Sequence, residues 1–291
     1  MKLPPLEYNA PTTLEEVLGL LDEHGDEAKL LAGGQSLVPM MAMRLARPAQ
    51  LVDINDVSSL DGIDDGGDTL AFGAITRERD AERSQLVAER VPVLAEALPL
   101  IGHVSIRNRG TIGGSIAHAD ASAELPAVAL VTDARMVVRS RRGERTIAAE
   151  EFFISHYMTA LRDDECLVEV RVPATPPGAG WSFQEIARRH GDFALVGVAA
   201  MVTLATGGAV DSARICLFGV SERPVRAREV EAALAGAPAS SATFAAAATD
   251  AVKDLEPASD MHGSSTYRRH IADVTVRRAL TIAAQRAGAP L

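Results

Sequence analysis

The apolar residues of the first 55 positions change their spacing from helical to strand-like. A capping-box pattern, with Thr12 or Thr13 three residues before Glu15 or Glu16, predicts a short helix that ends at Gly25, with apolar residues Leu14, Val17, Leu18 and Leu21. AKLLAGG then indicates a buried strand that stops at the glycines, SLVPMMAMRLA an apolar segment broken by Pro39, and AQLVDIND another strand. This order predicts a β-α-β-like unit with the AGGQS loop at the end of a strand.

From Thr69 the pattern shifts again. TLAFGAIT is typical of a strand, residues 82–98 have helical spacing, and residues 101–120 are irregular and punctuated by glycines. A short helix is expected to begin near Glu124, and RMVVRSRRGERTIA predicts a hairpin around Arg142 and Gly143. CLVEVRVP alternates as a strand does.

The densest cluster of prolines and glycines, PATPPGAG at residues 173–180, predicts a domain boundary. Three strand-like runs follow it, and then three helical segments at residues 225–234, 242–255 and 267–286. We therefore expect an α+β C-terminal domain, a three-stranded antiparallel sheet with three helices. The last helix is expected to have a broadly apolar face formed by Ile271, Val274, Val276, Leu280 and Ile282.

Composition narrows the functional classes. The chain has 291 residues, 47% of them apolar, and a formal net charge of −10, so it can bury the core of one large or two ordinary domains. Its basic residues are dispersed, which disfavours a nucleic-acid surface, and the run from Arg139 to Arg145 is expected to be a solvated hairpin.

The two cysteines, Cys166 and Cys216, stand in apolar strand-like runs far apart in the sequence. They cannot supply a disulfide framework or the ligands of an iron–sulfur cluster, so we expect both to be core residues. The N-terminus has no apolar leader region, and no run approaches the length of a membrane span. These patterns predict a cytoplasmic protein.

Two similar glycine motifs, LLAGGQS and GTIGGSIAHAD, are the strongest chemical signal in the chain. Glycines allow positive φ angles and close approach of the backbone, so successive N–H groups can hold anionic oxygen without a lysine. AGGQS follows a strand and precedes an apolar segment, and Ser36 and Ser115 each add a hydroxyl after their glycine pair. One such loop is usually only a tight turn, whereas two related ones favour a nucleotide diphosphate held from both sides.

Other familiar sites agree less well with these residues. The chain has no GxxxxGK[ST] motif and no GxGxxG motif that opens a helix, which excludes a P-loop and leaves a Rossmann site poorly supported. His103, His118 and Asp120, together with Ser105 or Ser115, could suggest a metal site or a catalytic triad. No third orienting group, G-x-S-x-G elbow or set of three metal ligands accompanies them, so we expect neither a catalytic nor a metal site.

Long segments of the chain resemble the FAD-binding medium subunit of the molybdenum hydroxylases, the family of carbon monoxide dehydrogenase and xanthine dehydrogenase. The resemblance rests on LLAGGQSLVPMMAMRLARPAQLVDIN and IRNRGTIGGSIAHADASAELPAVALVTDA, and continues through RRHGDFALVGVAA and YRRHIADVTVRRAL. These motifs occur in the family's order and cover essentially the whole chain.

The resemblance implies an FAD-binding domain of the vanillyl-alcohol-oxidase (PCMH) type at residues 1–174, with two α/β subdomains at about 1–55 and 56–174. A linker at 175–180 and a C-terminal domain at 181–291, like that of the CO dehydrogenase flavoprotein, would follow. In that fold the two glycine motifs hold the FAD diphosphate. They correspond here to Ala32, Gly33, Gly34, Gln35 and Ser36, and to Thr111, Ile112, Gly113, Gly114 and Ser115.

The resemblance also implies contacts beyond the diphosphate. An acidic cofactor ligand of the family matches Glu124, the side chains that cover the isoalloxazine ring match Ile101 and Phe193, and a backbone contact falls near Leu167. Two departures stand out. Some relatives have a flavin-side lysine where this chain has Gln184 and Glu185, although Arg188 or Arg189 could supply the charge. Gln35 replaces the histidine that binds flavin covalently elsewhere in the fold, so FAD is expected to be non-covalent.

The function implied by the resemblance is electron transfer within a heterotrimer. A large subunit would hold the molybdopterin cofactor and oxidise the substrate, and a small subunit would hold two [2Fe-2S] clusters. This chain would pass electrons through FAD to an external acceptor, in a complex expected to be a dimer of heterotrimers. The alternatives are a free-standing flavin-dependent oxidase or reductase of the same fold, and a nucleotide-binding module without a redox role. The substrate and the acceptor stay open.

Overall fold

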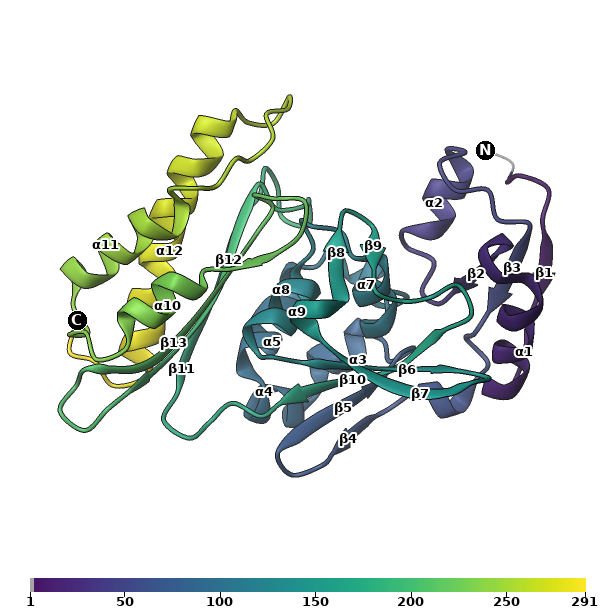
Figure 1. The fold of residues 1–291 in the computed structure, drawn as a ribbon, viewed down its shortest axis with the longest axis horizontal. Helices are drawn as coiled ribbons and strands as arrows, with labels where there is room; N and C mark the ends of the chain where they lie inside the picture. The colour runs from purple at the N-terminus through teal and green to yellow at the C-terminus, as the bar shows by residue number, and fades with distance from the viewer. Residues whose placement is uncertain (1–2) are drawn as a thin grey trace.

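The structure is a computed structural model that describes residues 3–291. Three sheets follow one another along its long axis (Figure 1). A three-stranded sheet stands near the N-terminus, a five-stranded sheet lies in the middle, and a four-stranded sheet carries the C-terminal helices. A short ribbon of β8 (Phe153–Ser155) and β9 (Met158–Thr159) flanks the middle sheet.

The first sheet is parallel, with β3 (Gln50–Asp53) between β1 (Glu7–Asn9) and β2 (Ala28–Leu31). It contains the predicted β-α-β unit, in which β2 and β3 are the two strands, and α1 (Leu14–His24) precedes β2 and buries its four predicted apolar residues. Of the two possible capping boxes the structure has the one formed by Thr13 and Glu16. The helix ends at Gly25, whose φ is 51°.

The apolar segment after the first glycine motif is a helix, α2 (Leu37–Ala42). The sequence predicted that Pro39 breaks this segment, and that expectation is wrong. Pro39 is the third residue of the helix, in the first turn, where backbone N–H groups have no acceptor within the helix.

The middle sheet is antiparallel and contains the predicted hairpin around Arg142 and Gly143. Its strands, in spatial order, are β4 (Ile63–Asp65), β5 (Thr69–Gly73), β10 (Cys166–Pro173), β6 (Arg135–Ser140) and β7 (Gly143–Ala148). The helical spacing at residues 82–98 corresponds to three short helices rather than to one. Ser84 caps the second of them and Pro92 starts the third, so each interrupts the helical path.

The helices of this region also include two inside the stretch that the sequence predicted to be irregular. The second glycine motif lies in one of them. The helices are α3 (Glu78–Arg83), α4 (Gln85–Arg90), α5 (Pro92–Ala97), α6 (Val104–Arg107), α7 (Ile112–His118), α8 (Glu124–Val131) and α9 (Ala149–Phe152).

The C-terminal sheet has four strands, one more than predicted. Its order is β11 (Gly180–Ile186), β12 (Val196–Leu204), β13 (Val210–Phe218) and β14 (Val225–Arg226). The extra strand takes the first residues of a segment that the sequence predicted to be helical. Because β14 has only two residues, its apolar spacing could not be distinguished from the start of α10 (Arg228–Leu234).

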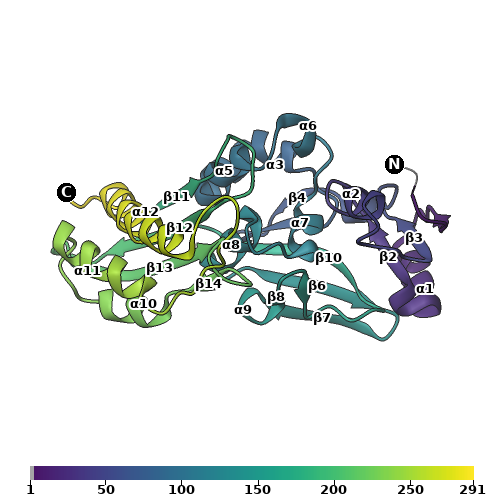
Figure 2. The same ribbon diagram turned by 90° about the horizontal axis from the view of Figure 1, so that it is seen from above.

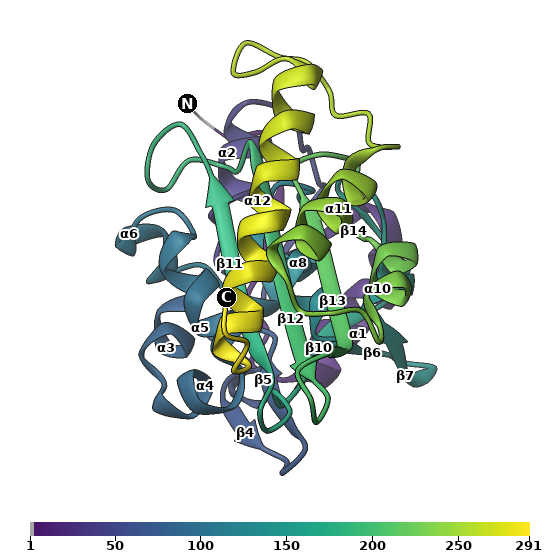
Figure 3. The ribbon, with the colours of Figure 1, turned by 90° about the vertical axis from the view of Figure 1, so that its left-hand side faces the viewer.

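Helices α10, α11 (Ser241–Val252) and α12 (Ser265–Arg286) cover the outer face of this sheet (Figures 2 and 3). The predicted apolar face of α12 is partly wrong. Val276 and Leu280 are buried, but the other contacts come from small residues, which let the helix lie close to β11 and β12; these are Ala272, Ala279, Ala283 and Ala284.

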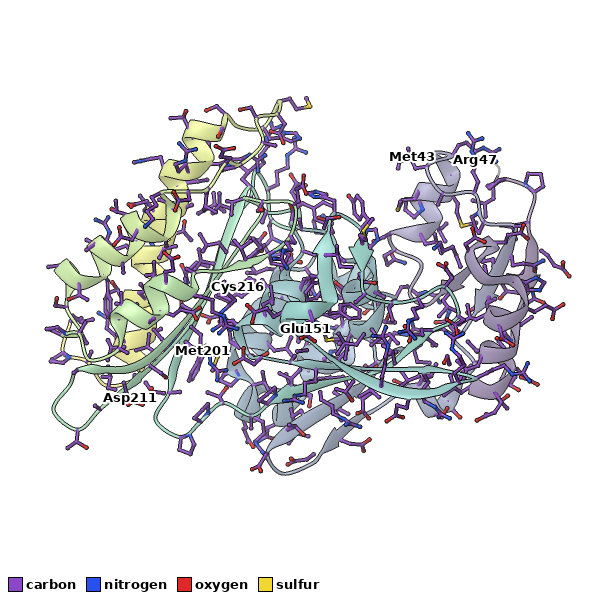
Figure 4. All side chains as sticks on the ribbon, viewed as in Figure 1. Met43, Arg47, Glu151, Met201, Asp211 and Cys216 are labelled. Atoms are coloured by element: carbon purple, nitrogen blue, oxygen red, sulfur yellow. The ribbon has the colours of Figure 1, made fainter. Side chains whose placement is uncertain are left out.

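The C-terminal sheet is buried on both faces. Side chains of alternate residues along β12 and β13 pack either against α10–α12 or against α8 of the preceding domain. Met201 and Cys216 belong to the second group, and Figure 4 shows them between the sheet and the middle of the molecule. Cys166 and Cys216 are both buried free thiols, which confirms the prediction that they are core residues.

Candidate functional site

The first glycine motif is the turn between β2 and α2. Gly34 has a φ of 72°, whereas Gly33 has no positive φ. A side chain on Gly33 would overlap the carbonyl oxygen of Arg109, just before the second glycine motif. Within residues 3–291 the backbone N–H groups of residues 33–36 donate no hydrogen bond to protein atoms. This turn therefore presents a row of donors of the kind that holds anionic oxygen.

Two side chains that the sequence did not single out connect the glycine motifs. The Asn55 amide donates to the carbonyl oxygen of Ala32 at 2.8 Å and accepts from the Arg77 guanidinium at 2.6 Å. Arg77 also donates to the carbonyl oxygen of Arg109 at 2.7 Å. Asn55 follows β3 and Arg77 follows β5, so their contact joins the ends of strands from two different sheets.

The second glycine motif is the first turn of α7, and Thr111 is its N-cap. The sequence suggested a second loop with free N–H groups, and the structure corrects this. The N–H groups of the next four residues bond within the protein, with the carbonyl oxygens of Thr76 and Ala74 and with Thr111 as acceptors; the donors are Ile112, Gly113, Gly114 and Ser115. This motif therefore contributes the positive end of a helix and two hydroxyl groups rather than a row of free donors.

The glycines of the second motif are required by packing, because neither Gly113 nor Gly114 has a positive φ. A Cβ atom on Gly113 would lie 2.6 Å from the backbone of Ala74, which holds α7 against the end of β5. A Cβ atom on Gly114 would lie 2.5 Å from the Thr111 hydroxyl oxygen, which leaves no room for it, and 3.6 Å from the Cβ of Ala32, an ordinary contact. The two motifs, nearly eighty residues apart, thus form one continuous surface.

The three residues assigned to the ring side of the cofactor differ in exposure. Ile101 is 8% exposed and Leu167 is buried at the start of β10, whereas Phe193 is 63% exposed. The loop that carries Phe193 lies beside Ile101, because a Cβ atom on Gly191 would be 2.8 Å from the carbonyl oxygen of Gly102. Ile101 and the Phe193 loop are therefore neighbours although they belong to different domains.

Glu124 is the first residue of α8 and is 5% exposed. Burial, with a smaller contribution from the negative charge of Asp120, raises the pKa of its carboxyl to about 7, against the opposing effect of a backbone hydrogen bond. From the C-terminal domain, Glu185 approaches Glu124. Burial raises the pKa of Glu185 to about 8, and the charge of Glu124 contributes.

The arginines close to Gln184 and Glu185 differ in their contacts. Arg188 contacts His262 at 2.9 Å between the Arg188 Nη1 and the His262 Nδ1, and Arg189 is exposed. The Gln184 amide donates to the Ser182 hydroxyl at 3.1 Å. That Arg188 or Arg189 supplies the flavin-side charge stays a prediction.

His118 and Asp120 have structural contacts. The Asp120 carboxylate accepts from the N–H of Ser122 at 2.8 Å and from the Tyr157 hydroxyl at 3.3 Å, and the His118 ring packs on Tyr157 with centroids 4.8 Å apart. Among the described residues no group of three or more His, Cys, Asp or Glu side chains is arranged to hold a metal ion. Nor does any helix there have the length and apolar character needed to cross a bilayer.

The chain matches known protein families over nearly all of its length. Residues 4–175 match the FAD binding domain in molybdopterin dehydrogenase, and residues 181–283 match the CO dehydrogenase flavoprotein C-terminal domain. The chain belongs to the FAD-binding medium subunits of the molybdopterin hydroxylases. It is thus a subunit of the oxidoreductase class that includes CO dehydrogenase and xanthine dehydrogenase, which confirms the family resemblance and the fold class expected from its motifs.

Relatives within this family have different substrates in their names. Subunit alpha of the 6-hydroxypseudooxynicotine dehydrogenase complex of Paenarthrobacter nicotinovorans is 44% identical over 99% of this chain and 97% of the relative. The carbon monoxide dehydrogenase medium chain of Hydrogenophaga pseudoflava is 41% identical over 96% of this chain and 97% of the relative.

Solved structures of the family superimpose closely on this medium subunit. A chain of carbon monoxide dehydrogenase from Hydrogenophaga pseudoflava has a TM-score of 0.95 at 43% identity, covering 98% of this chain and 99% of that chain. A chain of quinoline 2-oxidoreductase from Pseudomonas putida 86 has a TM-score of 0.93 at 41% identity, covering 99% of each chain.

Proposed function

We propose that the surface formed by the two glycine motifs binds the diphosphate of a non-covalent FAD. The single observation that carries this proposal is the meeting of the motifs, in which Gly33 packs on the carbonyl group of Arg109 and Gly114 lies against Ala32. The free N–H groups of residues 33–36 would bind the phosphate oxygens, and the N-terminus of α7 would add favourable electrostatics.

The ring-side residues would then orient the flavin and exclude water from it. Bound FAD supplies the redox chemistry, which is the transfer of electrons between a donor and an acceptor. Ile101 and Phe193 offer apolar surface from the two domains, Leu167 offers its backbone, and Glu124 offers a buried carboxyl. None of these residues needs to act as a nucleophile or a general acid, so the role of the chain is to bind and position.

We further infer that the chain works in a three-subunit complex, taking electrons from [2Fe-2S] clusters on a small subunit and delivering them to an external acceptor. The substrate would be oxidised on a large molybdopterin subunit. Two observations support this division. Both cysteines of the chain are buried in its core, and relatives are named as the medium chain or a subunit of dehydrogenase complexes.

The diphosphate assignment is tested with Gly33→Val. A valine side chain there would overlap the Arg109 carbonyl and separate the two motifs, so the purified variant should retain FAD at least about tenfold more weakly than the wild type. Gly19→Val is the matched control, because Gly19 has open space around it. Absorption spectra and equilibrium dialysis measure retention. Full FAD loading of Gly33→Val would contradict the assignment.

The subunit assignment is tested by expressing the chain alone. It should bind FAD and be reduced by dithionite, yet oxidise none of the substrates named for its relatives with a dye as acceptor. Turnover of such a substrate by the isolated chain would instead support a free-standing flavin oxidase or reductase.

A further inference from the structure

Glu78 is a buried carboxyl next to the second glycine motif that the function above does not use. It is the first residue of α3 and is 3% exposed. Its backbone N–H donates to the carbonyl oxygen of Gly110 at 2.9 Å, and its carboxyl group packs so closely on Gly110 that a Cβ atom there would overlap it. Gly110 directly precedes Thr111, the N-cap of α7, so the carboxyl lies directly beside the proposed diphosphate site.

The carboxyl of Glu78 is not neutralised by a cation. Its Oε2 has no hydrogen-bond partner among residues 3–291. The positive charge of Arg107 of α6 acts on it, but that guanidinium is held by both carboxylate oxygens of Glu82, at 2.8 and 3.1 Å, and by the carbonyl oxygen of Ile101 at 2.9 Å. Burying an unpaired carboxylate is costly, so the neutral acid is favoured.

The other charged groups around Glu78 do not compensate for this burial. Glu124 of α8 faces it with a second buried acid. Of the two arginines that flank Glu78 in the chain, Arg79 is paired with Glu82 at 2.8 Å, and Arg77 donates to Asn55 and to the Arg109 carbonyl oxygen. Burial first, and then the charge of Glu124, raise the pKa of Glu78 to about 8, against a smaller opposing effect of Arg107.

We propose that Glu78 is a further residue of the cofactor site, a neutral carboxylic acid behind the second glycine motif that makes FAD binding depend on the uptake of a proton. This inference rests on the proposed function, because the diphosphate supplies the charge. An anionic phosphate beside the carboxyl disfavours its ionised form and raises its pKa in the complex. The bound state therefore holds a proton, taken from solvent, that the free protein loses above pH 8.

The direction in which FAD affinity changes with pH follows from the protonation of Glu78 in the free protein and in the complex. Below about pH 8 the carboxyl is protonated both with and without FAD, so affinity is independent of the Glu78 proton. Above that value the free protein is ionised while the complex keeps the proton. The affinity for FAD should then fall about tenfold for each unit by which the pH rises, until the pH reaches the pKa of Glu78 in the complex.

Calorimetry tests this with the full chain freed of FAD. Titration with FAD at pH 8.5, in two buffers of different ionisation enthalpy, gives the number of protons taken up. Wild type should take up most of one proton, and its Kd should weaken about tenfold between pH 8.5 and 9.5. Glu78→Gln should take up markedly fewer protons, and its Kd should change by less than about threefold between the same two pH values. The control Glu89→Gln, at an exposed position, should behave as wild type.

The possible results separate the two proposals. Absence of FAD binding by wild type at every pH would refute the diphosphate site itself. Binding with equal proton uptake by wild type and Glu78→Gln would overturn the role of Glu78 alone, as would no uptake by wild type. If Glu78→Gln does not fold, Glu78→Asp and wild type are compared by infrared spectroscopy. Both should show a protonated carboxylic-acid band at pH 9 that appears with FAD, and its absence from both would equally overturn the proposal.

Discussion

Phe193 combines a large apolar side chain with high exposure, beside a buried isoleucine. At 63% exposed it contributes little to the core, whereas Ile101 next to its loop is 8% exposed. Exposed large apolar side chains often mark ligand or partner contacts, and the proposed flavin ring is a ligand that would cover Phe193.

Replacing Phe193 with alanine should therefore alter the surroundings of the flavin while leaving the stability of the fold nearly unchanged. We expect the free energy of unfolding to change by less than about 0.5 kcal/mol, because the side chain is exposed. The bound flavin should become more accessible, and its reoxidation by oxygen should be faster. Stopped-flow absorbance measures that rate, with Tyr8→Ala as an exposed aromatic control at the far end of the chain. An unchanged rate would remove Phe193 from the flavin environment.

At the scale of secondary-structure elements, the site depends on how two sheets are joined. Asn55 follows β3 of the first sheet and Arg77 follows β5 of the middle sheet, and their hydrogen bond of 2.6 Å connects the turns that carry the glycine motifs. Because Arg77 also donates to the Arg109 carbonyl, a single guanidinium fixes the distance between the motifs.

Arg77→Gln should weaken FAD binding about tenfold, because hydrogen bonds from a charged donor contribute roughly 1.5–3 kcal/mol and position both motifs. The matched control is Arg79→Gln, which removes the same charge two residues later but breaks only an ion pair with Glu82 within the same helix. Fluorescence titration of the FAD-free proteins compares the two variants. Equal affinities would show that Arg77 does not set the geometry of the site.

Some of these helices, strands and contacts could be predicted from the sequence, and others could not. The capping box at Thr13, the hairpin at Gly143 and the buried strands were predictable, because their signals lie within a few neighbouring residues. The helix that begins after Thr111 was missed, because its paired glycines have poor helix propensity and tertiary packing, including that of Gly113 on Ala74, stabilises it. Asn55 and Arg77 could not be found, because their contact joins two sheets.

At the scale of the whole molecule, the C-terminal domain completes the core of the preceding one. Phe183, Met201, Cys216 and Phe218 extend from its sheet into the same apolar cluster as residues of α5 and α8. An electrostatic interaction also joins the two domains, because the negative charge of Glu124 contributes to the raised pKa of Glu185 in β11. Figure 2 shows α8 against the C-terminal sheet, with α12 on the opposite face.

This shared core predicts that the two regions unfold together. Trp181, the single tryptophan of the chain, lies on β11 of the C-terminal sheet and reports on that region, whereas far-ultraviolet circular dichroism reports on the whole chain. Their urea transitions should coincide with one midpoint. Two separated midpoints would show that the C-terminal domain folds independently of the cluster that joins it to α8.

The most direct test of the central claim is a crystal structure of the chain with FAD bound. The diphosphate should lie between the two motifs, with its oxygens within hydrogen-bond distance of the N–H groups of residues 33–36 and next to the N-terminus of α7. The flavin ring should lie between Ile101 and Phe193. A diphosphate bound elsewhere, with the turn at Gly33 and Gly34 making no contact to it, would show that the two motifs do not form the cofactor site.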